Sequence, residues 1–201
     1  MRKILLATNN EGKVEALRAL LEGLPVEVVS PAELGIELDV PEVGATYAEN
    51  AREKALAFAA ATGLPSIADD SGLEIRALGG WPGLHSVRFA GPGVDLAQRQ
   101  AIILERMRGL VDRAARFVCV VALAEPGRVI AEADGVLEGT ILEAERGSGG
   151  FGYDRVFLPN GMTRTLAEIS EAEKASFTHR ARAIQALLPR LVTSLGLDLT
   201  R

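Results

Sequence analysis

Asp69 and Asp70 are adjacent carboxylates that directly follow a short apolar run, Ser66 to Ala68. Neighbouring carboxylates repel each other, so a pair held in a cleft needs a cation or strong hydrogen-bond donors. Mg²⁺ suits such oxygens, because it takes one or two carboxylates, keeps several waters and shares phosphate oxygens with a substrate. Glu42, in an early loop, is a further candidate oxygen ligand. The alternative is a solvated turn, which is the more common explanation of an Asp-Asp pair taken alone.

A second polar segment, Thr8 to Lys13, lies between an apolar run and a helical pattern. Asn10 is a suitable N-cap, and the unpaired N–H groups of a helix N-terminus favour an anion. Lys13 adds a positive charge in the first turn, where the helix dipole disfavours cations. The spacing of a P-loop is absent. Taken alone, the segment is better explained as an ordinary capped helix than as a phosphate site.

A glycine-rich loop, Gly147 to Asp154, contains two of the few aromatic residues of the chain, Phe151 and Tyr153. Glycine permits close backbone approach, and an aromatic face can stack on a nucleotide base. Aromatic side chains on a loop can equally cover the edge of a core. The sequence leaves both interpretations open.

Cationic side chains flank the start of the last expected helix, at Lys174 and in Thr178-His179-Arg180. This combination favours an anion, although a single such residue is more often a surface group. His85 is the only other histidine, which excludes a zinc site built on several histidines. The single cysteine, Cys119, lies in an apolar run and is expected to be a core residue.

Short apolar runs and amphipathic patterns alternate early in the chain, and β-rich runs cluster later. This order predicts a mixed α/β fold. The expected strands are 4–7, 26–29, 66–68, 73–77, 116–124 and 129–136, and the expected helices begin at Asn10, Thr46, Leu96 and Thr178. Trp81 and Pro82, in a loop with several glycines, are candidates for an exposed apolar patch.

The composition limits the class of partner. The 201 residues carry a net charge of −5, with a pI near 5.2, so the basic surface of a duplex nucleic-acid binder is missing. No apolar run reaches membrane-spanning length. With one cysteine and no signal peptide, the chain is expected to be a soluble cytoplasmic protein without nucleic-acid or membrane partners.

Taken in order, five segments resemble the inosine triphosphate pyrophosphatase family, also described as XTP/dITP diphosphatases. They are "LATNNEGKVEAL" from Leu6, "YAENAREKA" from Tyr47, "IADDSGLEIRALGGWPGLHSVRFAG" from Ile67, "GSGGFGYDRVFLP" from Gly147 and "EKASFTHRARA" from Glu173. They are collinear and span nearly the whole chain.

The resemblance implies an enzyme that hydrolyses non-standard purine nucleoside triphosphates (ITP, dITP, XTP) to the monophosphate and pyrophosphate. It implies one domain over residues 1–201, an elongated mixed α/β sheet with two lobes around a central cleft, a Mg²⁺ requirement and a homodimer.

The resemblance also assigns roles by position. Asp70 would be the proton acceptor and a metal ligand, Glu42 would be a second metal ligand, and a role of Asp69 at the metal is left open. The substrate would be held by Thr8, Asn9, Asn10, Glu11, Gly12, Lys13, Ser71, Phe151, Gly152, Tyr153, Asp154, Lys174, His179 and Arg180.

Three alternatives remain at this point. The first is a pyrophosphatase for modified pyrimidine nucleotides, and the second is a nucleotide sensor that binds ITP without turning it over. The third is a single-strand nucleic-acid binder that uses Phe151 and Tyr153, which the acidic balance of the chain disfavours.

Overall fold

The computed structural model describes residues 2–91 and 93–198. Its strands form one mixed sheet in the order β2-β1-β3-β4-β5-β6. The chain divides into two compact units. The first unit consists of Met1–Asp70, Cys119–Gly135 and His179–Arg201, and the second of Ser71–Val118 and Val136–Thr178. The α/β class and the mixed sheet expected from the sequence are confirmed.

The first unit is built on parallel strands joined by helices. In chain order its elements begin with β1 (Arg2–Leu6), α1 (Glu11–Leu20), β2 (Val26–Val29), α2 (Tyr47–Thr62) and β3 (Ser66–Ile75). Strand β1 lies between the other two and runs parallel to both. Leu5 of β1 pairs with Val29 on one side and with Ser66 on the other.

The capping residues expected from the sequence set the helix starts in this unit. The side chain of Asn10 accepts from the backbone N–H of Lys13 at the start of α1. Thr46 caps α2 in the same way, and Gly63 ends α2 with a φ of 72°. Only glycine adopts that left-handed conformation without cost, so α2 stops there.

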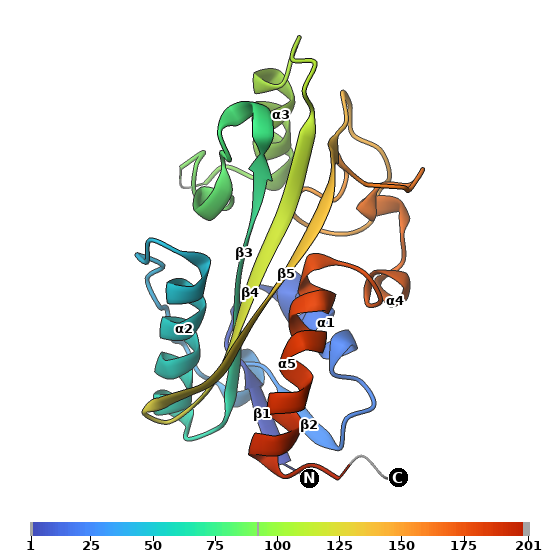
Figure 1. Ribbon diagram of the computed structural model, residues 1–201. Helices are drawn as coiled ribbons and strands as arrows, with labels where there is room; N and C mark the ends of the chain where they lie inside the picture. The colour runs from blue at the N-terminus through green and yellow to red at the C-terminus, as the bar shows by residue number, and fades with distance from the viewer. Residues whose placement is uncertain (1, 92, 199–201) are drawn as a thin grey trace. The chain divides into compact units, whose positions relative to one another are not determined.

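Two helical layers cover opposite faces of the sheet in the first unit. Helix α2 lies on one face, and α1 lies on the other with the last helix, α5 (His179–Leu195) (Figure 1). Ile67 packs into the cluster that contains Leu17 of α1 and Leu187 of α5, whereas Ala68 packs with residues of α2. Side chains alternate along a strand, so the two residues that follow in β3 also face opposite sides.

Strand β3 is longer than the sequence predicts. The sequence suggested two short strands interrupted by a polar turn at Asp69 to Gly72, and this prediction is wrong: β3 is continuous from Ser66 to Ile75. Aspartate, serine and glycine are poor strand formers on average. Here the strand lies between β1 and β4 and is buried along nearly its whole length, and this tertiary context overrides local preference.

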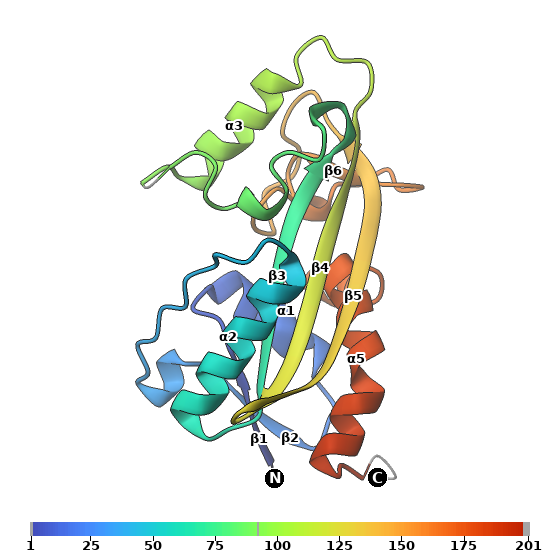
Figure 2. The ribbon, with the colours of Figure 1, turned by 60° about the vertical axis from the view of Figure 1, so that its left-hand side comes forward.

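The later strands form a hairpin. Strands β4 (Ala114–Glu125) and β5 (Arg128–Ile141) are joined at Pro126-Gly127, the turn expected from the sequence, which Figure 2 shows at the lower end of the two strands. Gly135 of β5 packs tightly on the start of α5: a Cβ there would lie 2.1 Å from the carbonyl oxygen of His179.

The second unit has its own core. Its remaining elements are α3 (Leu96–Arg106), β6 (Phe157–Pro159) and α4 (Glu171–Lys174). β6 pairs antiparallel with β5. Ile103, Phe117 and Phe157 pack together in this core, and the two phenylalanine rings lie 4.6 Å apart.

The expected apolar surface patch at Trp81 and Pro82 is not formed. Pro82 is buried, and Trp81 is half-buried against the ring of Phe89, 4.5 Å away. The guanidinium of Arg106 lies 4.0 Å from the centre of the Trp81 ring. Because these contacts cover the indole within its own unit, Trp81 and Pro82 do not form an exposed patch for a partner.

Candidate active site

Asp69 is the centre of a buried ion-pair cluster in the first unit. Its side chain is fully buried, and its Oδ2 lies 3.2 Å from Nζ of Lys13 and 3.1 Å from Nη2 of Arg180. Burial by itself would raise the pKa of Asp69, but the charges of Lys13 and Arg180 outweigh it and hold the pKa far below its usual range. Asp69 is therefore a permanent anion that holds α1 and α5 against β3.

Cys119 lies beside this cluster. Its Sγ is 4.0 Å from Oδ2 of Asp69, and burial together with the Asp69 charge raises the pKa of the thiol to about 12. The thiol therefore stays neutral and unreactive. The expectation that Cys119 is a core residue is confirmed, since it packs in the cluster around Leu17.

Asp70 faces the other side of β3, toward α2. Its Oδ2 accepts a hydrogen bond of 2.9 Å from Nδ2 of Asn50, and its Oδ1 lies 3.9 Å from Nζ of Lys54. Burial raises the pKa of Asp70, and this effect exceeds the opposing effects of Lys54 and Asn50. A carboxylate with a raised pKa accepts a proton more readily, which suits a general base.

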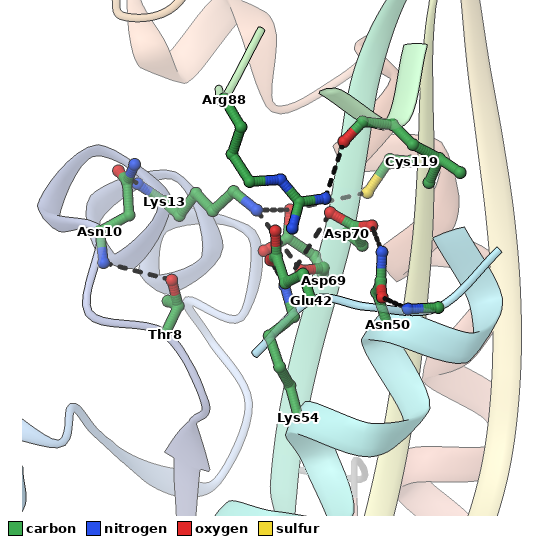
Figure 3. A network of polar contacts seen from close by, with 12 residues as sticks. Thr8, Asn10, Lys13, Glu42, Asn50, Lys54, Asp69, Asp70, Arg88 and Cys119 are labelled. Carbon is green, nitrogen blue, oxygen red and sulfur yellow. Dashed lines mark hydrogen bonds and ion pairs between the residues drawn. The ribbon is translucent and has the colours of Figure 1, made fainter. Parts of the chain in front are cut away.

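Lys54 joins the early loop to this carboxylate. Its Nζ lies 2.5 Å from Oε1 of Glu42 and 2.7 Å from the backbone carbonyl oxygen of Asp69 (Figure 3). Burial opposes a charge on Lys54, but the carboxylates of Asp69, Asp70 and Glu42 outweigh it and raise the pKa. Lys54 is thus a buried cation, and it brings Glu42 to the same side of β3 as Asp70.

The positions of Glu42 and Asp70 can be compared with the Mg²⁺ site expected from the sequence. Within residues 2–91 and 93–198, no group of three or more His, Cys, Asp or Glu residues is placed to hold an ion. The carboxylates of Glu42 and Asp70 nevertheless both pair with the ammonium group of Lys54, so their oxygens converge on a single cation. Two carboxylates, completed by waters and phosphate oxygens, fit the way Mg²⁺ is bound in nucleotide enzymes.

Asn50 and Lys54 were not singled out in the sequence, although a signal for them exists. They lie four residues apart in α2, on the stripe that also contains Ala51, Ala55 and Phe58, and both are buried. An amide and an ammonium on the apolar face of a helix need polar partners in the interior. That pattern pointed to a buried polar site next to α2.

The segment Thr8 to Lys13 forms the turn from β1 into α1. Oγ1 of Thr8 accepts from the backbone N–H of Asn10, and Nδ2 of Asn9 donates to the carbonyl oxygen of Leu38. Glu11 and Gly12 occupy the first turn of the helix. The unfavourable position of Lys13 in that turn is explained by its ion pair with Asp69.

His179 and Arg180 begin α5 and are both buried. Arg180 donates to Oδ2 of Asp69 from both Nε and Nη2. Burial, and next the charge of Arg180, lower the pKa of His179 well below its usual value. His179 is therefore a neutral imidazole at pH 7.

In the second unit, the glycine-rich loop is fixed by Asp154. Its Oδ2 accepts from the backbone N–H of Phe151 and from Nζ of Lys174, at 3.2 and 2.8 Å. A Cβ on Gly150 would lie 2.2 Å from the same oxygen, so this loop requires glycine there. Burial raises the pKa of Asp154 more than Lys174 lowers it.

The two aromatic residues of that loop differ in their surroundings. Tyr153 is buried in the core of the second unit, and its hydroxyl donates to the carbonyl oxygen of Ser86. Phe151 is half-buried, as is Gly152. Of the two interpretations left open, the structure supports core packing for Tyr153.

The remaining expected site residues are placed as follows. Ser71 follows Asp70 in β3 and is the first residue of the second unit. Thr178 is buried directly before α5. The structure thus brings together Glu42, Asp70, Lys13, Asp69 and Arg180 around β3 within the first unit, and Phe151, Asp154 and Lys174 within the second.

Comparison with known proteins identifies the family of this chain. The model of the Ham1 family matches residues 4–190. The chain belongs to the Ham1 family. A "dITP/XTP pyrophosphatase" of Gloeobacter violaceus is 48% identical over 94% of this Ham1-family chain and 93% of its own length. A protein of the same name from Thermus thermophilus is 47% identical over 92% of this chain and 90% of its own.

Solved structures give the same result for the fold. A Ham1 protein from Coxiella burnetii has a TM-score of 0.84 at 38% identity, covering 96% of this chain and all of its own. A nucleoside-triphosphatase, also named dITP/XTP pyrophosphatase, from Mycobacterium abscessus has a TM-score of 0.71 at 40% identity, covering 93% of this chain and 99% of its own. The resemblance to the inosine triphosphate pyrophosphatase family is confirmed.

Proposed function

We propose that this chain is a nucleoside-triphosphate pyrophosphatase that removes deaminated purines from the nucleotide pool. It hydrolyses ITP, dITP and XTP to the nucleoside monophosphate and pyrophosphate. The relatives named dITP/XTP pyrophosphatase, which match more than nine-tenths of the chain, support this substrate class. The observation that carries the proposal is Asp70, a buried carboxylate with a raised pKa, beside the Lys54–Glu42 pair.

The chemistry requires a base and nearby cations. A water molecule attacks the α-phosphorus, its proton passes to Asp70, and the bond from the α-phosphorus to the bridging oxygen breaks to release pyrophosphate. Lys13 and Lys54 lie within the same polar cluster and offset negative charge as it develops. Positioning and electrostatics carry most of such a transfer, so no covalent nucleophile is needed.

Mg²⁺ is part of the proposal. Glu42 and Asp70 are the residues that would hold it, because their oxygens already converge on one cation in the structure. When bound, the ion supplies positive charge that neutralises phosphate oxygens and the leaving group.

The remaining substrate contacts are also proposals. Thr8 to Lys13 are assigned to the triphosphate, and Ser71, Phe151 to Asp154, Lys174, His179 and Arg180 to the base and phosphates. The helix start next to Asn10 supports the first assignment, because its N–H groups favour anions. We treat residues 1–201 as one catalytic domain, and the continuous course of β3 from residue 66 to 75 supports this.

A panel of nucleoside triphosphates tests the proposed function, with and without Mg²⁺ and with pyrophosphate as the measured product. ITP, dITP and XTP are expected to be cleaved roughly 10²–10⁴-fold faster than ATP in kcat/KM, and GTP also slowly. Adenine carries a 6-amino donor where these bases carry a 6-oxo acceptor. Protein donors that pair with the 6-oxo group are left unpaired when adenine is bound. Each unpaired buried donor costs about 1–3 kcal/mol, and two such donors account for the expected ratio.

Other results of the panel would favour the alternatives. Comparable kcat/KM for ATP and ITP would contradict the purine assignment, and orthophosphate as the first product would contradict cleavage at the α-phosphorus. Binding of ITP without turnover would indicate a sensor. Faster cleavage of modified pyrimidine nucleotides would indicate the related pyrophosphatases, and strong salt-dependent binding of oligonucleotides a single-strand binder.

We expect a homodimer. Among the described residues, large apolar side chains are exposed at Val43, Val87 and Val111, the last to 98%. Light scattering at micromolar concentration is expected to give twice the 21.3 kDa mass of the chain, and a monomer would contradict this.

Within the described part of the chain no helix is both long and apolar enough to cross a membrane. The cytoplasmic location remains a prediction.

A further inference from the structure

We propose that Asn50 is a positioning residue that fixes the orientation of the Asp70 carboxylate, and that Gly44 is the backbone element that fixes Asn50. In this arrangement the Asn50 amide holds Oδ2 of Asp70 and so sets the direction in which Oδ1 points. The inference rests on the proposed function for the role of Asp70. It concerns residues to which neither the sequence motifs nor the assigned site gives a role.

Both ends of the Asn50 amide are used. The residue is only 1% exposed. Its Nδ2 donates to Oδ2 of Asp70 at 2.9 Å, and its Oδ1 accepts from the backbone N–H of Gly44 at 2.8 Å. A backbone N–H can only donate, so it forces the oxygen of the amide toward Gly44 and the nitrogen toward Asp70. The direction of the hydrogen bond to Asp70 is therefore determined by the loop.

Gly44 makes this contact because it lacks a side chain. A Cβ at this position would lie 2.7 Å from Oδ1 of Asn50 and 2.8 Å from Cβ of Glu49. The neighbouring loop backbone is held as well, since the N–H of Ala45 donates to the Glu49 carboxylate at 2.6 Å. Any larger residue at position 44 must therefore push the Asn50 amide or the loop away.

The two oxygens of Asp70 consequently have different environments. Oδ2 accepts from the Asn50 amide, and Oδ1 lies on the side of Lys54, 3.9 Å from its Nζ (Figure 3). Rotation of the carboxylate would break a buried hydrogen bond and leave the Asn50 donor unsatisfied. Asn50 thus holds one oxygen of the base toward the Lys54 and Glu42 side, where the reaction is proposed to take place.

Three variants test the Gly44–Asn50 and Asn50–Asp70 contacts separately. Asn50→Asp keeps an acceptor for Gly44 but removes the donor to Asp70. Asn50→Ala removes both contacts, and Gly44→Ala displaces the amide without changing either residue of the Asn50–Asp70 pair. Glu53→Ala, an exposed position in the same helix, is the matched control.

We expect kcat to fall roughly 10- to 100-fold in both Asn50 variants, which is the usual cost of a misplaced reacting group. Gly44→Ala should lie between these variants and wild type. KM and the dissociation constant of the substrate should change less than about threefold, because the amide is not assigned to substrate binding. The control should behave as wild type.

Thermal unfolding distinguishes positioning from stability. A folded Asn50→Ala protein with wild-type kcat would overturn the inference. The inference would also be overturned if kcat and KM both changed across the variants in proportion to the unfolding temperature. The ratio of variant to wild type is measured on whichever triphosphate wild type hydrolyses fastest, so an error in the base specificity does not affect it.

A spectroscopic measurement makes the test independent of turnover. The side-chain amide signal of Asn50, assigned with Asn50→Asp, should move when Asp70 is replaced by Ala and stay in place in Glu53→Ala. An unchanged amide signal in Asp70→Ala would overturn the inference even for an enzyme without activity on any triphosphate of the panel, a result that would separately refute the proposed function.

Discussion

Replacing Asp70 with asparagine is expected to lower kcat by roughly 10²–10⁴-fold, the contribution typical of a single general base. An amide has nearly the same shape as a carboxylate but cannot accept the proton of the attacking water at neutral pH. The substitution also removes one of the two side-chain carboxylates that face the Lys54 ammonium. The measurement is steady-state hydrolysis of ITP with pyrophosphate detection.

The variant must be shown to be folded. Far-UV circular dichroism and thermal unfolding should be close to wild type, because the fold around Asp70 is packed by apolar neighbours such as Ala51 and Ala68. Asp134→Asn, the same substitution at an exposed position of β5, is the control and should keep wild-type kcat. A folded Asp70→Asn protein with near wild-type kcat would assign the base to another group.

Replacing Asp69 with asparagine is expected to lower the free energy of unfolding by about 3–5 kcal/mol, as found when one partner of a buried ion pair is removed. The change leaves Lys13 and Arg180 buried near each other without the carboxylate that neutralises them. The loss should be measured by urea unfolding, with the slope on denaturant compared to confirm that the same transition is observed.

An exposed pair of the same type provides the control. Arg76 and Asp112 form a two-bond guanidinium–carboxylate contact at 2.7 and 2.8 Å, and both side chains are open to solvent. Asp112→Asn should change stability little, because solvent screens such a pair. If both variants lose the same free energy of unfolding, burial does not explain how the Asp69 cluster stabilises the fold.

Local pattern predicted most of the fold. The helix starts at Asn10 and Thr46 and the turn at Pro126-Gly127 depend on residues within one turn of the backbone, and they were found from the sequence. Strand β3 was not, because its polar centre is stabilised by neighbours far away in the chain, including α1, α2 and α5. Tertiary contacts of this kind leave no trace in a window of ten residues.

The candidate site was predicted in part for the same reason. The family resemblance pointed to Asp70 and Glu42. The buried stripe of α2 indicates a polar site at Asn50 and Lys54, but nothing local shows that Asp70 and Glu42 are their partners. Adjacency in the sequence was also misleading for Asp69 and Asp70. The pleat of the strand separates their side chains to opposite faces, so the repulsion that a shared site would create is avoided.

Around β3, the described side chains of the first unit pair three cations with three carboxylates: Lys13, Lys54 and Arg180 with Glu42, Asp69 and Asp70. Such a cluster has almost no field at long range, and the whole chain, with a net charge of −5, repels a polyanion. At the triphosphate site proposed above, affinity must therefore arise at contact, where internal ion pairs are exchanged for bonds to phosphate, and not from attraction at a distance.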